Sequence, residues 1–237
     1  MLPGARSPKP DMSTSRHQFL LRRLHSLMGL LPVGGFVVLH LLENARARLG
    51  PAAYDRMQAA KDSSAWMPFL EWGFIFLPIA YHACYGLFIA SQSRRTLSLG
   101  IYNQGGTWRF WMQRVTGILL LAFLAFHVWE TRIHSEGLPT YAWMSDLFNT
   151  RPWVRPLYVL GILSAAYHFA NGLWSASIVW GLAVRERSQR AVLKYVSVPV
   201  FMLVAFLGCY ALFQFKPQAR VAEHAPRLQG SGPEPLR

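Results

Sequence analysis

Five long stretches of this chain contain no Asp, Glu, Lys or Arg, and this feature restricts the fold more than any other. A helix that crosses a bilayer needs about 20 mostly apolar residues, and four of the stretches meet that requirement. The third is shorter, but the preceding Arg114 can extend its side chain toward the interface. Because backbone groups in hydrocarbon must be satisfied within each segment, we expect helices. The stretches are residues 24–42, 72–93, 115–129, 156–184 and 195–215.

This pattern predicts an all-α membrane protein with five transmembrane helices in one domain, residues 19–215. Only 15% of the residues are charged, compared with about a quarter in a soluble domain. We expect residues 1–18 to be a disordered N-terminal extension, with Met12 as an alternative start, and residues 216–237 to be a disordered tail.

The net charge of +13 does not indicate nucleic-acid binding, because of where the charges lie. In two loops, 91–114 and 182–194, every charged residue except Glu186 is an arginine or a lysine. Short cytoplasmic loops are enriched in these residues. We therefore expect a cytoplasmic N-terminus and an outer C-terminus, with the basic face meeting anionic lipid or a cytoplasmic partner.

A histidine lies well inside each of the first four stretches, and the fifth has none. Ionisable groups at membrane depth are rare and are candidates for function. For one histidine alone, the simpler alternative is a neutral imidazole hydrogen-bonded between helices. Four of them, one on each helix of a bundle, favour a shared metal chemistry. They are His40, His82, His127 and His168.

The positions of these histidines predict two levels in the membrane. His40 and His127 each lie three residues before a glutamate that ends the stretch, about one turn or 5 Å from the outer end. Their stretches run in the same direction, so the two histidines share an outer level. His82 and His168 lie closer to the middle of the two oppositely directed stretches, and so share another level.

Two imidazoles that face each other across a bundle core suit a six-coordinate haem. Two histidine ligands leave no open iron position, which favours electron transfer over oxygen binding. Zinc or copper would need more ligands at one level. The pattern therefore predicts that the first four helices form a bundle that binds two b haems. No C-x-x-C-H motif is present to attach haem covalently.

The segments AYHACYGL (80–87) and AYHFANGL (166–173) repeat the same arrangement. Gly86 and Gly172 follow their histidines by four residues, so they share the helix face and leave room for a macrocycle edge. Close packing between helices is the alternative role for both glycines. Near the inner ends of the helices, arginines could bind haem propionates or anchor the helices in lipid headgroups. These are Arg22, Arg23 and Arg114.

Several segments resemble one known family, the single-chain dihaem cytochrome b anchor of succinate dehydrogenase. They are RRLHSLMGLLPVG, VVLHLLEN, FLPIAYHACYG, QRVTGI, FHVWETR and YHFANGLWS, and the similarity covers about residues 12–215. The resemblance is closest to the cytochrome b558 type found with menaquinone-using complexes. It implies five transmembrane helices in the bacterial cytoplasmic membrane. It also implies an inner haem on His82 and His168 and an outer haem on His40 and His127.

The resemblance further implies the partners and the role of the chain. A flavoprotein subunit would oxidise succinate, and an iron–sulfur subunit would dock on the cytoplasmic side. This chain would carry electrons through the two haems to a quinone, expected to be menaquinone, near the outer haem. It would thus be the quinone-reacting membrane subunit of a respiratory and tricarboxylic acid cycle enzyme, without catalytic residues for succinate. His25 is expected to bond a propionate or to face the partner subunit.

One position departs from the family pattern. Some dihaem fumarate reductases carry a glutamate two residues before the fourth-stretch histidine, where this chain has Ala166, so that proton route is not expected here. Glu43, Glu71 or Glu130 could carry protons at a quinone site. Their simpler interpretation is as solvated helix ends.

Two other functions are consistent with apolar helices that contain histidines. The chain could be the cytochrome b subunit of a hydrogenase or formate dehydrogenase, although the HVWETR and NGLW motifs argue against this. It could also be a transporter or structural anchor without haem. The haem content of the purified protein distinguishes the last alternative from the others.

Overall fold

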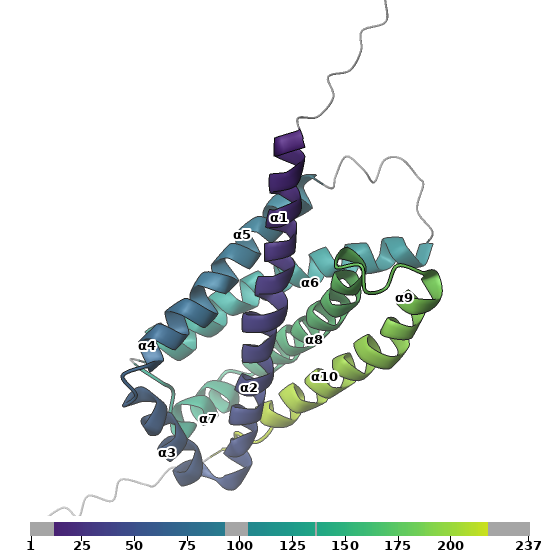
Figure 1. Cartoon of the computed structure of the whole chain (residues 1–237). Helices are drawn as coiled ribbons and strands as arrows, with labels where there is room; N and C mark the ends of the chain where they lie inside the picture. Colours follow the sequence, from purple (N-terminus) through teal and green to yellow (C-terminus); the bar gives the residue numbers. More distant parts are fainter. Residues whose placement is uncertain (1–11, 93–103, 136, 218–237) are drawn as a thin grey trace, which may run out of the picture.

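The computed structural model describes residues 12–92, 104–135 and 137–217, and the regular structure within these ranges is helical throughout (Figure 1). The helices are α1 (Met12–Met28), α2 (Gly34–Ala45), α3 (Pro51–Asp62), α4 (Met67–Leu70), α5 (Leu77–Gln92), α6 (Gln104–Val128), α7 (Tyr141–Thr150), α8 (Val154–Val179), α9 (Glu186–Val192) and α10 (Val198–Leu212).

Wide π-helical turns join several of these helices into longer rods. Such turns connect α1 to α2, α4 to α5 and α9 to α10, and one extends α6 at its C-terminal end. Proline lacks an N–H group and its ring collides with the carbonyl four residues earlier. A locally wider turn accommodates that collision. Pro32 lies inside the first of these turns, and Pro78 and Pro199 follow closely after two others.

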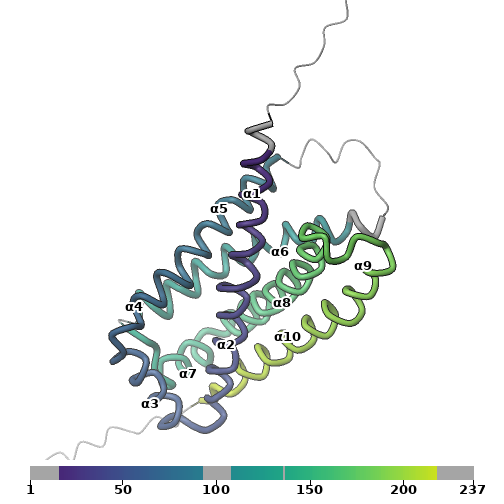
Figure 2. The backbone as a smooth tube through the Cα atoms, viewed as in Figure 1, coloured from purple at the N-terminus to yellow at the C-terminus, as the bar shows by residue number. Residues whose placement is uncertain are grey.

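Helix α8 occupies the centre of the bundle. Its most extensive contacts are with α6 and α10, and α10 packs in turn against α2. Figure 2 shows the α1–α2 rod crossing the others at an angle, with α5 beside its N-terminal half. The short helices α3 and α7 contact each other at one end of the bundle, and α9 lies at the opposite end. The rods therefore bring residues from distant parts of the sequence to shared levels.

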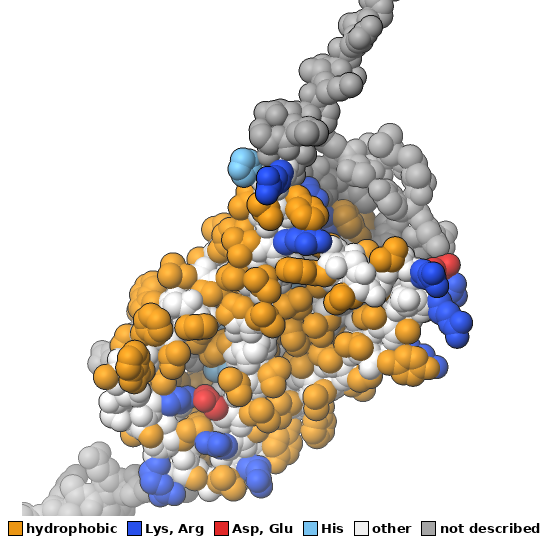
Figure 3. Space-filling view, viewed as in Figure 1, with side chains coloured by type: hydrophobic (Ala, Val, Ile, Leu, Met, Phe, Trp, Pro, Cys, Tyr) orange, Lys and Arg blue, Asp and Glu red, His pale blue; other side chains and the backbone are white. Residues whose placement is uncertain are grey.

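Four rods in the described ranges are long and apolar enough to cross a membrane. Figure 3 shows hydrophobic side chains covering the band between the charged groups of the two ends. Exposed Leu, Phe and Trp side chains on these rods are therefore expected to face lipid rather than water. Four of the five predicted spans therefore coincide with rods that could cross a membrane. The candidate spans are Arg16–Leu49, Met67–Gln92, Trp108–Ile133 and Glu186–Leu212.

Most of the remaining predicted stretch, 156–184, lies in the long helix α8, which ends at Val179 and is not among these four candidates. Its interior carries polar side chains, including the buried Ser164, Asn171 and Ser177. Neighbouring helices cover α8, so polar groups there contact protein rather than lipid, and apolar composition is less necessary. Crossing of the membrane by α8 thus stays a prediction.

The end of the bundle near α3 and α7 is closed by aromatic side chains. Tyr54, Tyr141 and Phe215 pack together there, in edge-on and tilted contacts. The Ser145 hydroxyl donates to the Lys216 carbonyl at 2.6 Å, which fixes the residues after α10 onto α7. These aromatic side chains therefore close the bundle at the end where α3 and α7 lie.

The predicted terminal segments lie largely outside the described residues. Helix α1 begins at Met12, so its first turns fall within the region 1–18 for which we expected disorder. Residues 1–11 and 218–237, which hold the rest of those segments, are outside the description.

Candidate functional site

The inner pair of histidines meets between α5 and α8. The ring centroids of His82 and His168 lie 6.0 Å apart, with planes at 84°. The Nδ1 atom of His82 lies 3.0 Å from the carbonyl oxygen of His25, and that of His168 lies 3.1 Å from the carbonyl oxygen of Gln113. A carbonyl oxygen only accepts, so each Nδ1 carries the proton and donates. Each Nε2 therefore keeps a free lone pair, the form that binds a metal.

His25 adds a third imidazole at this level. Its ring lies parallel to that of His82, with centroids 4.1 Å apart and planes within 5°. The backbone carbonyl of the same residue accepts from His82, so His25 fixes that ring by both its side chain and its main chain. The sequence predicted that His25 lies near the inner end of the first helix, but it did not indicate this stacking on His82.

Two glycines make space for the inner rings. A Cβ atom on Gly29 would lie 2.3 Å from Cε1 of His82, and one on Gly117 would lie 3.1 Å from Cε1 of His168. Neither glycine was identified from the sequence. Gly86 and Gly172 were identified from the sequence. A Cβ atom added on Gly86 would lie 3.2 Å from Cε1 of His25, and one on Gly172 would lie 3.8 Å from the side-chain amide nitrogen of Gln113.

A polar network links α6 to α8 next to His168. The Asn171 amide donates to the Gln113 side-chain oxygen at 2.7 Å, and the Gln113 amide donates to the His168 carbonyl at 3.1 Å. The Thr116 hydroxyl lies 3.4 Å from Nδ1 of His168 and is itself bonded to its own helix. These bonds fix the spacing of the two helices at the inner level.

The outer pair of histidines meets between α2 and α6. The ring centroids of His40 and His127 lie 5.7 Å apart, with planes at 83°. Nδ1 of His127 lies 3.1 Å from the Tyr158 hydroxyl. The Asn44 amide nitrogen lies 3.4 Å from Nε2 of His40 and donates to the His40 carbonyl at 2.8 Å. The structure thus brings together both pairs that the sequence predicted, at two separate levels.

The predicted arginines lie at the end of the bundle that holds the start of α1. Arg22 is exposed, whereas the Arg23 guanidinium lies over the Trp180 ring at 5.0 Å. Arg114 donates to the Phe110 carbonyl at 2.9 Å. Arg109, which was not singled out from the sequence, lies over Trp174 at 4.8 Å.

The three glutamates considered as proton carriers all form ion pairs. Glu43 pairs with Lys61 at 2.8 Å and Glu71 with Arg132 at 2.7 Å. Glu130 is 5% exposed, and it bonds Arg151 at 2.8 Å and His134 at 3.2 Å. For Glu130, the interpretation as a solvated helix end is therefore wrong. Arg151, which follows α7 in the chain, meets it there, and the local sequence does not reveal this contact.

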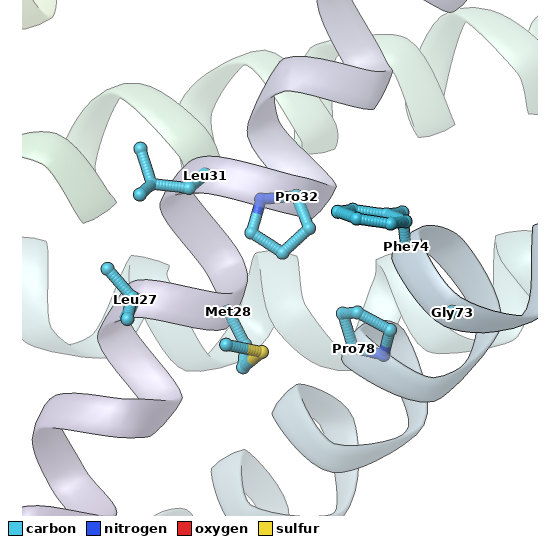
Figure 4. Close-up of a pocket in the computed structure, with 7 residues that line it drawn as sticks. All are labelled: Leu27, Met28, Leu31, Pro32, Gly73, Phe74 and Pro78. Carbon is cyan, nitrogen blue, oxygen red and sulfur yellow. The ribbon is translucent and has the colours of Figure 1, made fainter. Parts of the chain in front are cut away.

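One groove of about 430 Å³ lies between the α1–α2 rod and the α4–α5 rod (Figure 4). The side chains that line it are all apolar, so a molecule bound there would be held mainly by shape and apolar contact. The residues are Leu27, Met28, Leu31, Pro32, Gly73, Phe74 and Pro78.

The two pairs fit a prosthetic group better than a metal held by protein alone. Within the described ranges, no three His, Cys, Asp or Glu side chains gather as a metal site. Each pair offers two imidazoles, and at the inner level His25 stacks on the face of His82. A metal bound by one pair would need further ligands, which a haem would supply as four ring nitrogens. The Nε2 atoms of the inner pair would be the nitrogens able to bind such a group.

Comparison with known proteins agrees with this chemistry. Residues 90–209 match the family described as succinate dehydrogenase/fumarate reductase transmembrane subunit. The chain is 40% identical to the succinate dehydrogenase cytochrome b558 subunit of Bacillus subtilis (strain 168) over 206 residues, or 86% of this chain and 100% of that protein. This chain belongs to the succinate dehydrogenase/fumarate reductase transmembrane subunit family.

A second member of this functional group is more distant. The succinate dehydrogenase hydrophobic membrane anchor subunit of Archaeoglobus fulgidus is 26% identical over 102 residues, covering 43% of this chain and 84% of that protein. The predicted family is thus confirmed. As a transmembrane subunit of the succinate dehydrogenase type, the chain is embedded in a membrane as part of an oxidoreductase complex, and it associates with other subunits of that complex.

Proposed function

We propose that this chain binds two b haems and carries electrons from the iron–sulfur subunit of succinate dehydrogenase to a quinone. The observation that carries this proposal is the meeting of four histidines from four helices as two pairs at two levels. The name of the Bacillus subtilis relative, a cytochrome b558, supports haem b as the prosthetic group.

In this proposal, His82 and His168 ligate the inner haem, and His40 and His127 ligate the outer haem. A bis-histidine haem exchanges single electrons at its iron without an open coordination position. The protein's part would be to orient each imidazole, and at the inner level the Nδ1 bonds to backbone carbonyls leave Nε2 as the nitrogen that could bind the iron. All four histidine side chains are partly buried between the helices.

Basic side chains at the inner end are suited to the carboxylates of the inner haem. Arg23 and Arg109 each stack on a tryptophan, and each has a buried Nε atom without a hydrogen-bond partner. These are available donors for an anion. We also assign Arg22, Arg114 and His25 to the binding of these carboxylates, and Gly86 and Gly172 to the space around the haem edge.

We place five helices across the bacterial cytoplasmic membrane, α8 included, with the N-terminus in the cytoplasm. The basic inner end would then face the iron–sulfur subunit, and beyond it the flavoprotein subunit. The quinone, expected to be menaquinone, would react near the outer pair.

The test is the spectrum of the purified complex. We expect about two b haems per copy of this chain, reduced by succinate and reoxidised by a water-soluble menaquinone analogue. A correctly folded complex that lacks haem would refute the proposal. Haem that is reduced by succinate but not reoxidised by the analogue would refute only the quinone assignment.

A further inference from the structure

The inner and outer histidines are held by different kinds of group. At the inner level, both Nδ1 atoms donate to backbone carbonyls, those of His25 and Gln113. At the outer level, Nδ1 of His127 instead meets a side chain, the Tyr158 hydroxyl, at 3.1 Å. A side chain that contacts a ligand can tune it. This contact is the basis for a specific role for Tyr158.

Packing fixes the position of the Tyr158 ring. The residue is only 5% exposed. Phe123 and Phe148 meet it edge-on, with centroids 5.1 Å and 4.8 Å away and planes at 89° and 84°. Phe123 also stacks on His127 at 5.6 Å, so this one side chain contacts both rings. The hydroxyl is therefore held beside the imidazole by well-packed aromatic contacts rather than by one flexible side chain.

The direction of this hydrogen bond follows from ligation. If Nε2 of His127 binds a metal, the ring proton resides on Nδ1, and the Tyr158 oxygen must accept it. We propose that Tyr158 is a positioning residue that sets the orientation and basicity of His127 as an outer haem ligand. This rests on the proposed function. An accepted hydrogen bond makes the imidazole a stronger donor to the metal, which stabilises the oxidised state.

Tyr158→Phe tests this role because it removes the hydroxyl and keeps the ring. The matched control is Tyr210→Phe on α10, whose ring packs on Phe206 away from the histidines. Both variants are prepared as the complete complex, and the two haems are titrated separately by spectroscopy under controlled potential. We expect the potential of the outer haem to rise in Tyr158→Phe, with an altered electron paramagnetic resonance signal from that haem alone. The inner haem and the control should match the parent.

Several outcomes decide the matter. Unchanged potentials and signals in Tyr158→Phe, or equal shifts in both haems, would overturn the proposal. If the variant loses haem, the proposal requires that only the outer signal disappears, and loss of the inner signal also refutes it. A parent complex without haem would instead refute the proposed function, so the two failures are distinguishable.

Discussion

The ring of His25 stacks on that of His82, with centroids 4.1 Å apart and planes within 5°. The backbone carbonyl of His25 also accepts a hydrogen bond from Nδ1 of His82. This double contact resembles the way in which outer-shell groups fix metal ligands in other proteins. It joins α1 to α5 at the level where we propose the inner haem.

Replacement of His25 should weaken inner haem binding without abolishing it. His25→Ala removes the ring that stacks on His82 but keeps the backbone carbonyl that accepts from it. We therefore expect about a tenfold loss of affinity for the inner haem. His25→Phe should restore much of it, because a flat ring is again present. Haem retained per chain after gel filtration is the measurement, with the exposed His17→Ala as control. Equal retention in all three variants would contradict the prediction.

The four proposed ligands should behave as two pairs. We expect His82→Ala or His168→Ala to remove the inner haem while the outer one persists. His40→Ala or His127→Ala should have the opposite effect. Low-temperature absorption spectra of the reduced complexes distinguish the two haems. If all four variants kept both haems, the assignment of ligands would be wrong.

Gly29→Ala should disturb the inner level, because its Cβ atom would lie 2.3 Å from Cε1 of His82. Overpacking of this kind costs about 1–3 kcal/mol. Gly35→Ala is the matched control, since a Cβ there meets nothing within 4 Å. We expect a lower thermal midpoint and less inner haem for Gly29→Ala alone. Identical midpoints for the two variants would show that the ring moves aside freely.

Glu130→Gln should destabilise the outer end of the bundle. The buried carboxylate bonds both Arg151 and His134, and the variant removes its charge. Loss of a charged hydrogen bond to a partly exposed arginine costs about 1–3 kcal/mol. The exposed pair of Glu186 and Arg190 provides a control, because Glu186→Gln should change stability little. Thermal unfolding in detergent compares the two, and similar losses would argue against a special role for burial.

Tyr54 should make the protein sensitive to alkaline pH. Burial, with smaller contributions from Asp55 and Glu43, raises the pKa of Tyr54 well above its usual value. The neutral hydroxyl is therefore favoured in the folded protein. Its contribution to stability is complete below the unfolded pKa of about 10 and is lost as pH rises above that value.

Tyr54→Phe removes this titration. We expect its stability to fall less steeply above pH 10 than that of the parent, as measured by unfolding at a series of pH values. The exposed Tyr195→Phe should follow the parent. Parallel pH profiles for Tyr54→Phe and the parent would show that Tyr54 does not govern the alkaline loss.

Much of the architecture follows from local sequence. The absence of charges from long stretches predicts where helices cross the membrane, because hydrocarbon penalises exposed polar groups at every position. Counting residues to the nearest glutamate then predicts the depth of His40 and His127, since a helix has a constant rise. These arguments need no knowledge of which helices are neighbours.

The remaining features depend on contacts between distant segments. Gly29 is next to His82 only because α1 crosses α5, and nothing within either helix indicates that crossing. From the sequence, Glu130 is interpreted as a solvated helix end, and only the fold shows that it pairs with Arg151. Nothing in the sequence around Tyr158 indicates that its hydroxyl lies next to His127. Sequence patterns reveal the face and depth of a residue, but not its partner on another helix.

The polar interior of α8 has a consequence for assembly in the membrane. Among the five helices that we place across the bilayer, it is the one not apolar enough to be a candidate span by itself. Its buried Asn171 and Ser177 would be exposed to lipid if it inserted alone. Insertion of α8 should therefore depend on α6, which precedes it in the chain and supplies Gln113 as partner for Asn171. The central helix of the bundle would thus be held in the membrane by its neighbours.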